Sequence, residues 1–335
     1  MESRSGQIPR VKSTLSISDM AGTVMTRIGI NRNNYRVAPG LYGIGNPDSD
    51  SPVLVTANYK LSFDKVRKEL KYTDAWLLVL DTRGINVWCA AGKGTFGTEE
   101  VVRSVKATGL DTVVSHRNLI LPQLGATGVS ARQVKKECGF KVIWGPILAA
   151  DIERFLDSGM KADKTMRRVT FTTMERLVLI PVEISISLKP MLWIVLVVFI
   201  LSGIGPDLFS LKAAWTRSLM AAAALAGGVF AGAVLTPAFL PKIPGRAFYI
   251  KGAITGFLTA AGILLWYRQD AGLLELSALL LFTMAVSSFM AMNFTGTTPF
   301  TSPTGVEKEM RRAIPMQIAA VFFAGFAWIG AGFSG

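Results

Sequence analysis

The sequence predicts an α/β domain followed by an all-α membrane domain of about five helices, and three observations support this division. Half of the 335 residues are hydrophobic, but the excess lies mainly after about residue 190, where charged residues become rare. Strand and helix patterns alternate from about residue 52. Five later stretches are long and apolar enough to cross a bilayer, which takes about 20 residues. We therefore expect a basic N-terminal segment (1–45), an α/β domain (46–189) and a membrane domain (190–335).

The N-terminal segment is basic and has little periodic pattern. It lacks the apolar stretch of a secretory signal, and its one patterned part is a short amphipathic stretch near Met20–Ile30. We assign no strand to this segment.

The α/β domain is predicted from strands that alternate with helices. Thr98 and Ser130 are expected to cap two of the helices. Such alternation predicts a mostly parallel, Rossmann-like sheet, whose ligands lie at the carboxyl ends of the strands. The apolar segment Met166–Leu188 is interrupted by charges, so we expect strands or an interfacial segment there and not a span. The expected strands are 52–59, 75–80, 112–115 and 140–144, and the expected helices are 63–70, 99–107, 130–138 and 151–156.

The membrane domain is predicted to anchor or dock the α/β domain and not to pump, because its spans carry almost no central charge. Several spans are rich in Ala and Gly, which lets helices approach closely. Lys and Arg cluster before the first span and in alternate loops, which predicts an inner-membrane protein with a cytoplasmic N-terminal domain and the C-terminus outside. The net charge of +13 is explained in the same way, without nucleic acid. The expected spans are 190–209, 219–239, 248–267, 273–293 and 313–333.

The most informative motif is GINVWCAAGKGTFGT, at Gly84–Thr98. Gly92, Gly94 and Gly97 fit the dinucleotide pattern G-x-G-x-x-G, but an acidic residue at the end of the next strand is missing. A second interpretation fits better. The WCAA run forms a short helix that ends in glycine, and the glycines let the backbone approach a large flat ligand. Cys89 then faces that ligand, and its soft thiolate is a strong axial donor to a metal such as cobalt.

Five stretches of the soluble part carry a resemblance to a known family. They are NPDSDSPVLVTANYKLSFD, LVLDTRGINVW, AAGKGTFGTEE, LILPQLGATGVSA and GFKVIWGPI, and they cover most of residues 45–188. Together they resemble the corrinoid-binding domain of the corrinoid iron–sulfur protein large subunit of the acetyl-CoA pathway. A Cys within NVWCAAGK, joined to a C-terminal membrane domain, is similar to the mercury-methylation corrinoid proteins, the HgcA family.

The resemblance implies a cobalamin-type corrinoid with Cys89 as the lower cobalt ligand and catalytic residue. The segment from Asn86 to Lys93 would form a cap helix below the corrin, while the glycine loop to Thr98 and the stretch Leu121–Ser130 would wrap the ring. The implied binding residues are Thr56, Asn58, Asn86, Val87, Trp88, Cys89, Ala90, Ala91, Gly92, Lys93, Gly94, Thr95, Gly97, Thr98, Leu121, Gln123, Gly125, Gly128, Ser130 and Gly145.

The resemblance also implies an activity, namely methyl transfer to inorganic mercury(II), giving methylmercury. Cobalt(I) would take a methyl group from a methyltetrahydrofolate-dependent donor, and the thiolate would push electron density through methyl-cobalt(III) toward the methyl. Resetting cobalt requires low-potential electrons, which implies a ferredoxin-like 4Fe-4S partner, HgcB. The remaining partner is membrane lipid, and no nucleic acid is expected. The main alternative is a membrane-anchored corrinoid methyl carrier with a different acceptor; a transporter with a nucleotide-sensing domain and a structural scaffold explain less of the motif.

Two other residues invite a metal role that we do not assign. Cys138 lies on a helix face beside two lysines and is expected to be structural. His116 lacks the D-x-H-x-x-G pattern of His-ligated corrinoid proteins, so we expect it to hydrogen-bond in a turn at a strand end. The two cysteines have no CxxC spacing, which argues against zinc and against a disulfide framework.

Overall fold

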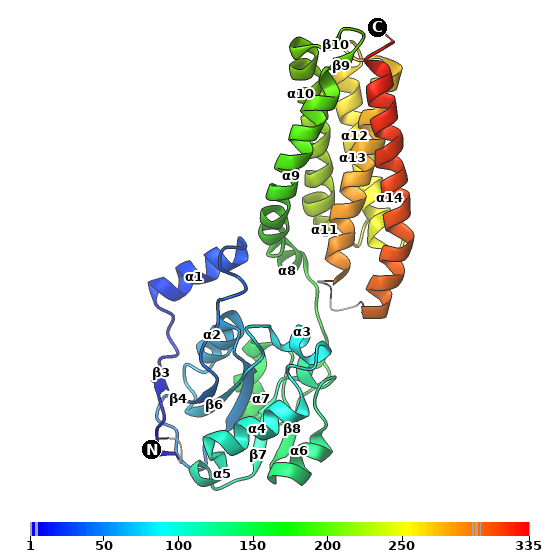
Figure 1. The fold of residues 1–335 in the computed structure, drawn as a ribbon. Helices are drawn as coiled ribbons and strands as arrows, with labels where there is room; N and C mark the ends of the chain where they lie inside the picture. Colours follow the sequence, from blue (N-terminus) through cyan, green and yellow to red (C-terminus); the bar gives the residue numbers. More distant parts are fainter. Residues whose placement is uncertain (1, 4–5, 297, 299–300, 302, 335) are drawn as a thin grey trace. The chain divides into compact units, whose positions relative to one another are not determined.

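The computed structural model describes residues 2–3, 6–296, 298, 301 and 303–334, and the chain divides into two compact units (Figure 1). The first unit contains the chain up to Thr26 and residues 30–170. The second contains Arg27–Gly29 and the chain from Phe171 onward. The two units are described separately below.

The first unit is built on a six-stranded sheet in the order β3-β4-β6-β5-β7-β8. β4 is antiparallel to β6, and every other neighbouring pair is parallel. The predicted α/β class is therefore confirmed as a mixed, mostly parallel sheet with helices. The strands are β3 (Arg10–Val11), β4 (Gly40–Ile44), β5 (Val53–Ala57), β6 (Ala75–Leu80), β7 (Asn118–Leu121) and β8 (Lys141–Trp144), and a separate hairpin is formed by β1 (Glu2–Ser3) and β2 (Gly6–Gln7).

Helices cover both faces of the sheet, which explains why β5 and β6 are buried along their whole length. Alternate side chains of β6 belong to two different core clusters: Trp76, Leu78 and Leu80 to one and Leu77 and Val79 to the other. The first cluster also holds α3, α4 and α6, and the second holds α2 and α7. The helices are α2 (Lys60–Glu69), α3 (Val87–Gly92), α4 (Thr98–Thr108), α5 (Leu110–Val113), α6 (Ala131–Cys138) and α7 (Ile152–Asp157), with 3-10 turns η1 (Gln123–Gly125) and η2 (Ala149–Asp151).

Two predictions about the sheet were wrong. Thr112 and Val113, predicted as part of a strand, lie in the helix α5, and residues 114–115 follow it, because Gly109 ends α4 in the left-handed conformation (φ 60°) and the chain turns at once into another helical turn. The strand is β7, further along the chain. The N-terminal segment, to which no strand was assigned, contributes β3 and β4, and β4 pairs with β6 in the middle of the sheet.

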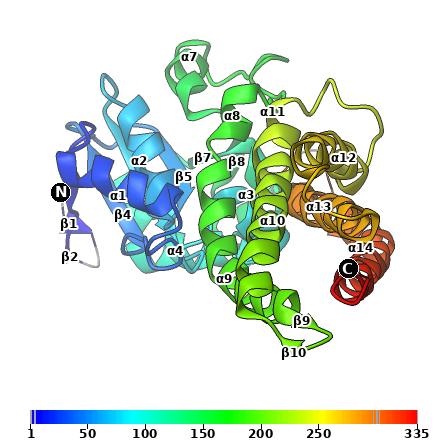
Figure 2. The ribbon, with the colours of Figure 1, turned by 90° about the horizontal axis from the view of Figure 1, so that it is seen from above.

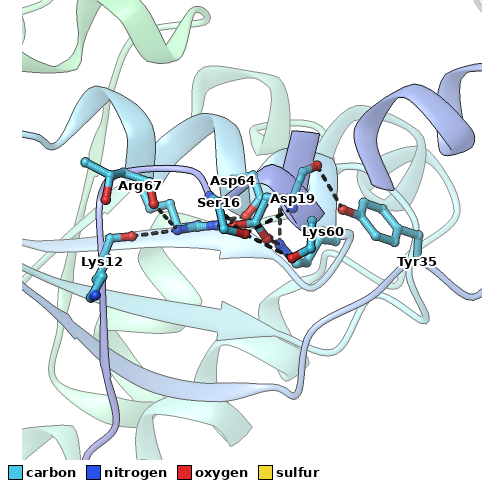
Figure 3. A network of polar contacts seen from close by, with 9 residues as sticks. Lys12, Ser16, Asp19, Tyr35, Lys60, Asp64 and Arg67 are labelled. Carbon is cyan, nitrogen blue, oxygen red and sulfur yellow. Dashed lines mark hydrogen bonds and ion pairs between the residues drawn. The ribbon is translucent and has the colours of Figure 1, made fainter. Parts of the chain in front are cut away.

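The helix α1 (Ile17–Arg27) is attached to α2 by a polar network (Figure 3). Asp19 accepts hydrogen bonds from Lys60 Nζ (2.6 Å) and Arg67 Nη2 (2.8 Å). Both cations also bind Asp64, which is almost fully buried. The amphipathic stretch predicted near Met20–Ile30 is thus a helix whose polar side is fixed to the first unit.

The second unit contains, among the described residues, five helical segments long and apolar enough to cross a membrane. This finding fits the predicted number of spans. Viewed end-on, α13 lies between its neighbours (Figure 2) and contacts α10, α12 and α14. The segments comprise α8 (Thr173–Leu177) with α9 (Ile180–Gly203), α10 (Leu211–Phe230) with the π-turn η3 (Ala231–Leu235) and α11 (Thr236–Ala238), α12 (Phe248–Tyr267), α13 (Leu273–Asn293) with η4 (Phe294–Gly296), and α14 (Pro303–Ala331).

The first span begins and ends earlier than predicted. We placed it at 190–209, whereas α9 runs over 180–203 and contains Pro190 in its interior. Proline interrupts helices in water but is tolerated in membrane helices. The helix ends where the hairpin β9 (Ile204–Gly205) and β10 (Leu208–Phe209) turns through Pro206. The strand interpretation of Met166–Leu188 was wrong, because Thr172 and Glu175 form a capping box that starts the helix α8, and α9 follows it.

Small and polar residues hold the second unit together. A Cβ atom at Gly252 would lie 2.6 Å from the Ser287 carbonyl oxygen, so glycine is required where α12 meets α13. Arg217 is buried in the first half of α10, where its Nε binds Glu275 at 2.9 Å and its guanidinium stacks on Trp328. These contacts determine which helices lie side by side, which the apolar character of the sequence alone does not.

Candidate functional site

The candidate site lies at the edge of the sheet where the parallel strands β5, β6, β7 and β8 end. Asn58 follows β5 and is almost completely buried (2% exposed). Its Oδ1 accepts hydrogen bonds from the backbone N–H groups of Thr82 (3.1 Å) and Gly84 (2.9 Å). Asn58 thereby fixes the turn after β6, in which Arg83 (φ 59°) and Gly84 (φ 75°) are both left-handed. This turn leads directly into α3.

The helix α3 carries Cys89 in its first turn. Asn86 is the N-cap, in an extended conformation, and its Oδ1 accepts the backbone N–H of Cys89 at 2.9 Å. This capping satisfies one N–H group that the helix start leaves unpaired. The predicted short helix from Asn86 to Lys93 therefore forms, with Asn86 and Lys93 as its two caps.

The two sides of α3 differ. Val87, Ala90 and Ala91 are buried in the core, whereas Cys89 and Trp88 are half-buried. Residues three and four positions apart lie on one helix face, so Cys89 shares the outer side with Gly92 and Lys93, both exposed. A Cβ atom at Gly92 would meet no other atom within 4 Å. The sulfur therefore lies on a face with open space beside it.

The glycine loop after α3 folds back onto the helix. Gly94 is left-handed (φ 80°) with open space at its Cβ position, and the N–H groups of Thr95 and Phe96 both donate to the Ala90 carbonyl. Phe96 is fully buried. Phe96 was not among the predicted site residues, although an aromatic residue inside a glycine-rich loop is a signal that the loop is anchored in the core.

One predicted cap in this loop was wrong. The N-cap of α4 is Gly97, and Thr98 is the first helical residue. Thr98 has a different partner, because its Oγ1 accepts the backbone N–H of Ser130 at 2.8 Å. Ser130 caps α6 as predicted, since its side chain accepts the N–H of Gln133.

The stretch Leu121–Ser130 packs against α3 and the glycine loop. A Cβ atom at Gly128 would lie 2.3 Å from the Phe96 carbonyl oxygen and 3.1 Å from the Ala91 Cα, and one at Gly125 would lie 2.5 Å from the Phe96 ring. These two glycines allow close packing within the protein. The structure thus brings the stretch beside the residues around Cys89, with Gly125 and Gly128 facing protein atoms.

The remaining predicted binding residues make contacts within the unit. Thr56 and Leu121 are buried in the sheet, and Gly145 donates its N–H to the Leu121 carbonyl at 2.8 Å. Gln123 Oε1 accepts a hydrogen bond from Arg167. All of them lie at or near the carboxyl edge, but Thr56 and Asn58 are covered by the protein.

The other thiol and the single histidine lie away from this edge. Burial raises the pKa of Cys138, and its Sγ donates to the Val134 carbonyl. His116 lies at the start of β7, at the opposite edge of the sheet, where Nε2 contacts the Ser51 carbonyl (2.9 Å) and Nδ1 accepts the N–H of Asn118. Both therefore make local structural contacts. Within the described residues, no three His, Cys, Asp or Glu side chains gather as a metal-binding group.

The comparison with protein families identifies the class to which this unit is similar. Residues 23–156 match the family model described as the CO dehydrogenase/acetyl-CoA synthase delta subunit. The matched region contains the strand ends, α3 and the glycine loop described above, and it ends before the first membrane segment begins at Thr173.

Individual relatives give the same result. Residues of this chain are 36% identical to the acetyl-CoA decarbonylase/synthase complex subunit gamma of Methanopyrus kandleri over 128 residues, which is 38% of this chain and 27% of that protein. They are 34% identical to the corrinoid/iron-sulfur protein large subunit of Moorella thermoacetica over 122 residues, which is 36% of this chain and 27% of that protein. The chain thus spans about a quarter of the length of these curated relatives. The matches support a corrinoid protein family for the α/β unit.

Proposed function

We propose that this chain is a membrane-anchored, corrinoid-dependent methyltransferase of the HgcA type, with a Rossmann-like corrinoid-binding domain. Its proposed reaction is methyl transfer to mercury(II), with Cys89 as the lower axial ligand of cobalt. The observation that carries the proposal is the position of Cys89, on the open side of a capped helix at the carboxyl edge of the sheet. Ligands of open α/β sheets bind at this edge.

The residues around Cys89 fit a large flat cofactor. Gly92 and Gly94 have open space where a side chain would project, so a ring can approach the backbone there. Asn86 holds the first turn of α3 and thereby positions the Cys89 backbone. When bound, the corrinoid would supply the cobalt centre that carries the methyl group. The protein would supply a soft thiolate donor, a capped helix and two glycines with open space at their Cβ positions.

The proposed partners follow from the chemistry. Mercury(II) is a soft electrophile and is the methyl acceptor. A methyltetrahydrofolate-dependent donor would supply the methyl group, and a ferredoxin-like 4Fe-4S protein, HgcB, would supply the low-potential electrons that a cobalt cofactor requires. The five membrane segments anchor the α/β unit in the inner membrane, with that unit on the cytoplasmic side.

A second candidate is a membrane-anchored corrinoid methyl carrier with another acceptor. The names of the relatives favour it, because they belong to proteins of acetyl-CoA decarbonylase/synthase complexes and not to mercury enzymes. The two candidates share the cofactor and Cys89 and differ only in the acceptor.

The acceptor is tested with the full chain in lipid nanodiscs, loaded with methylated corrinoid. Mercury(II) and a ferredoxin-like partner are added, and methylmercury is measured by mass spectrometry. We expect methylmercury from the wild type and from Cys138→Ala, and at least tenfold less from Cys89→Ala. If the wild type keeps its methyl group in the presence of mercury(II), the carrier with another acceptor is correct.

A further inference from the structure

The helix α1 exposes a continuous apolar stripe. Ile17, Met20 and Val24 follow one another at spacings of three and four residues, which places them on one side of the helix, and Ile28 comes directly after its last residue. Their exposed fractions are 82%, 51%, 60% and 37%. Contiguous apolar surface of this kind marks an interaction site more often than scattered apolar residues do.

The stripe is not the result of a loosely attached helix. The opposite side of α1 is held by Asp19, which binds both Lys60 and Arg67 of α2 (Figure 3). Tyr35, beyond the end of the helix, donates its hydroxyl to the Asp19 carbonyl. These contacts fix the rotation of α1 about its own axis, so its apolar side is held outward.

The charges around the stripe have one sign. Residues 10–36 contain five basic side chains, of which Arg10, Lys12, Arg27 and Arg36 are exposed. The single acid in this range is Asp19, and both of its carboxylate oxygens are bound within the first unit. Arg27, three positions after Val24, lies on the same side of α1, which is therefore apolar and cationic. This combination is typical of helices that lie in the headgroup region of an anionic membrane.

We propose that α1 is an interfacial helix that binds anionic phospholipid, with Ile17, Met20, Val24 and Ile28 inserted at the level of the headgroups. The same chain provides the membrane, because its second unit holds five segments able to span one. The helix also ends at Arg27, and Arg27–Gly29 are grouped with that second unit.

Binding of α1 to lipid would also affect the orientation of the first unit, because α1 lies near the turn that leads into α3. The chain that follows the helix contacts the turn leading into α3, since a Cβ atom at Gly84 would lie 3.5 Å from the Asn33 carbonyl oxygen and from the Arg36 Cβ. Figure 1 shows α1 and α3 at the same end of the first unit. Binding of α1 to lipid would therefore hold the Cys89 edge of the sheet toward the membrane surface.

The test is hydrogen–deuterium exchange of the full chain in nanodiscs, with no added partner. Exchange of the peptide covering residues 15–30 is compared in phosphatidylcholine with and without phosphatidylglycerol, and in detergent micelles. We expect roughly tenfold slower exchange with phosphatidylglycerol. The double variant Met20→Gln/Val24→Gln should lose this difference. Tyr72→Gln, which changes a more exposed residue of the same unit (80% exposed), should keep it.

Two outcomes would overturn the proposal. Equal protection in all three environments would show that α1 packs against protein. Equal and weak protection in all three would show that the stripe is free or awaits a protein partner. Unchanged exchange of β5 and β6 in the variants checks that the fold is intact. The readout does not require corrinoid, so its failure would leave the proposed function untouched.

Discussion

Asn86 is the residue that positions Cys89, and its side chain can be changed without touching the sulfur. Asn86→Ala removes the cap on the Cys89 N–H and should destabilise α3 by about 1 kcal/mol. We expect roughly fivefold faster hydrogen exchange in residues 87–93, together with a weaker cobalt–thiolate absorption band. Asn86→Asp keeps a capping oxygen and should restore both. Faster exchange with an unchanged band would show that the cap stabilises α3 without positioning the thiolate.

Alanine substitutions at Gly92 and Gly128 test the proposed cofactor site and the packing of the fold separately. Gly128→Ala would force a Cβ atom against the Phe96 carbonyl and should cost about 1–3 kcal/mol. Gly92→Ala meets open space and replaces a helical glycine, so thermal stability should be kept or slightly raised. Under the proposed function the Gly92 variant should nevertheless bind corrinoid more weakly. Thermal unfolding and cobalamin titration of both variants measure this; equal corrinoid affinity in Gly92→Ala and the wild type would argue against a ring above α3.

The sequence predicts single residues well where the interaction is local. Ser130 caps the helix that begins directly after it, as predicted, because a helix start is a short-range signal. Asn86 also caps its helix, although only its place at the start of that helix was predicted. Thr98 also had a capping residue type, but its hydroxyl binds Ser130, which is 32 positions away. The burial of Thr56 and Asn58 depends on neighbouring strands in the same way. Their side-chain partners follow from tertiary packing, which residue type alone does not determine.

At the scale of elements, α1 depends on the ionisation of Asp19. Burial alone would raise the pKa of this carboxyl, but hydrogen bonds from Lys60, Ser16 and Arg67 together hold the pKa well below its usual value. The stabilisation is therefore complete above the unfolded-state pKa of about 3.9, and it is lost as the pH falls below that value.

We expect Asp19→Asn to release α1 at neutral pH, at a cost of about 1–3 kcal/mol. Hydrogen-exchange protection factors for residues 17–27 should fall in the variant. They should also become independent of pH between about pH 3 and pH 7. The wild type should lose protection only below about pH 4. Glu69→Gln, which removes a more exposed ion pair on α2, is the control and should change little. Full protection in Asp19→Asn would contradict the role of this network.

Elements with strong periodic patterns were predicted closely, and others were not. β6 (75–80) and α13 (273–293) lie where the sequence places them, because a buried apolar run and a long apolar stretch each allow one structure. β4 was missed, since Gly40–Ile44 contains two glycines and is stabilised by pairing with β6. The Thr112–Ser115 segment is rich in β-branched residues, yet its first two residues lie in the helix α5, and tertiary context overrides such propensities.

At the scale of the whole molecule, the two units should be separable in function. All the contacts described around Cys89 lie within the first unit, so a chain ending at Thr170 should bind corrinoid with the same spectrum as the full chain. In-cell methylmercury formation should fall at least tenfold, because the truncated protein lacks the five membrane segments. Mass spectrometry of methylmercury in cells, at matched protein levels, measures this. Full in-cell activity of the truncated chain would remove any role for the membrane unit.

The ultraviolet–visible spectrum of the corrinoid-loaded full chain tests whether the Cys89 sulfur binds cobalt. Wild type, Cys89→Ala and Cys138→Ala are compared at equal cobalamin content. We expect a cobalt–thiolate spectrum for the wild type and for Cys138→Ala, and its loss in Cys89→Ala. If Cys89→Ala and the wild type have the same spectrum, the Cys89 sulfur does not bind cobalt, and the proposed mechanism is wrong.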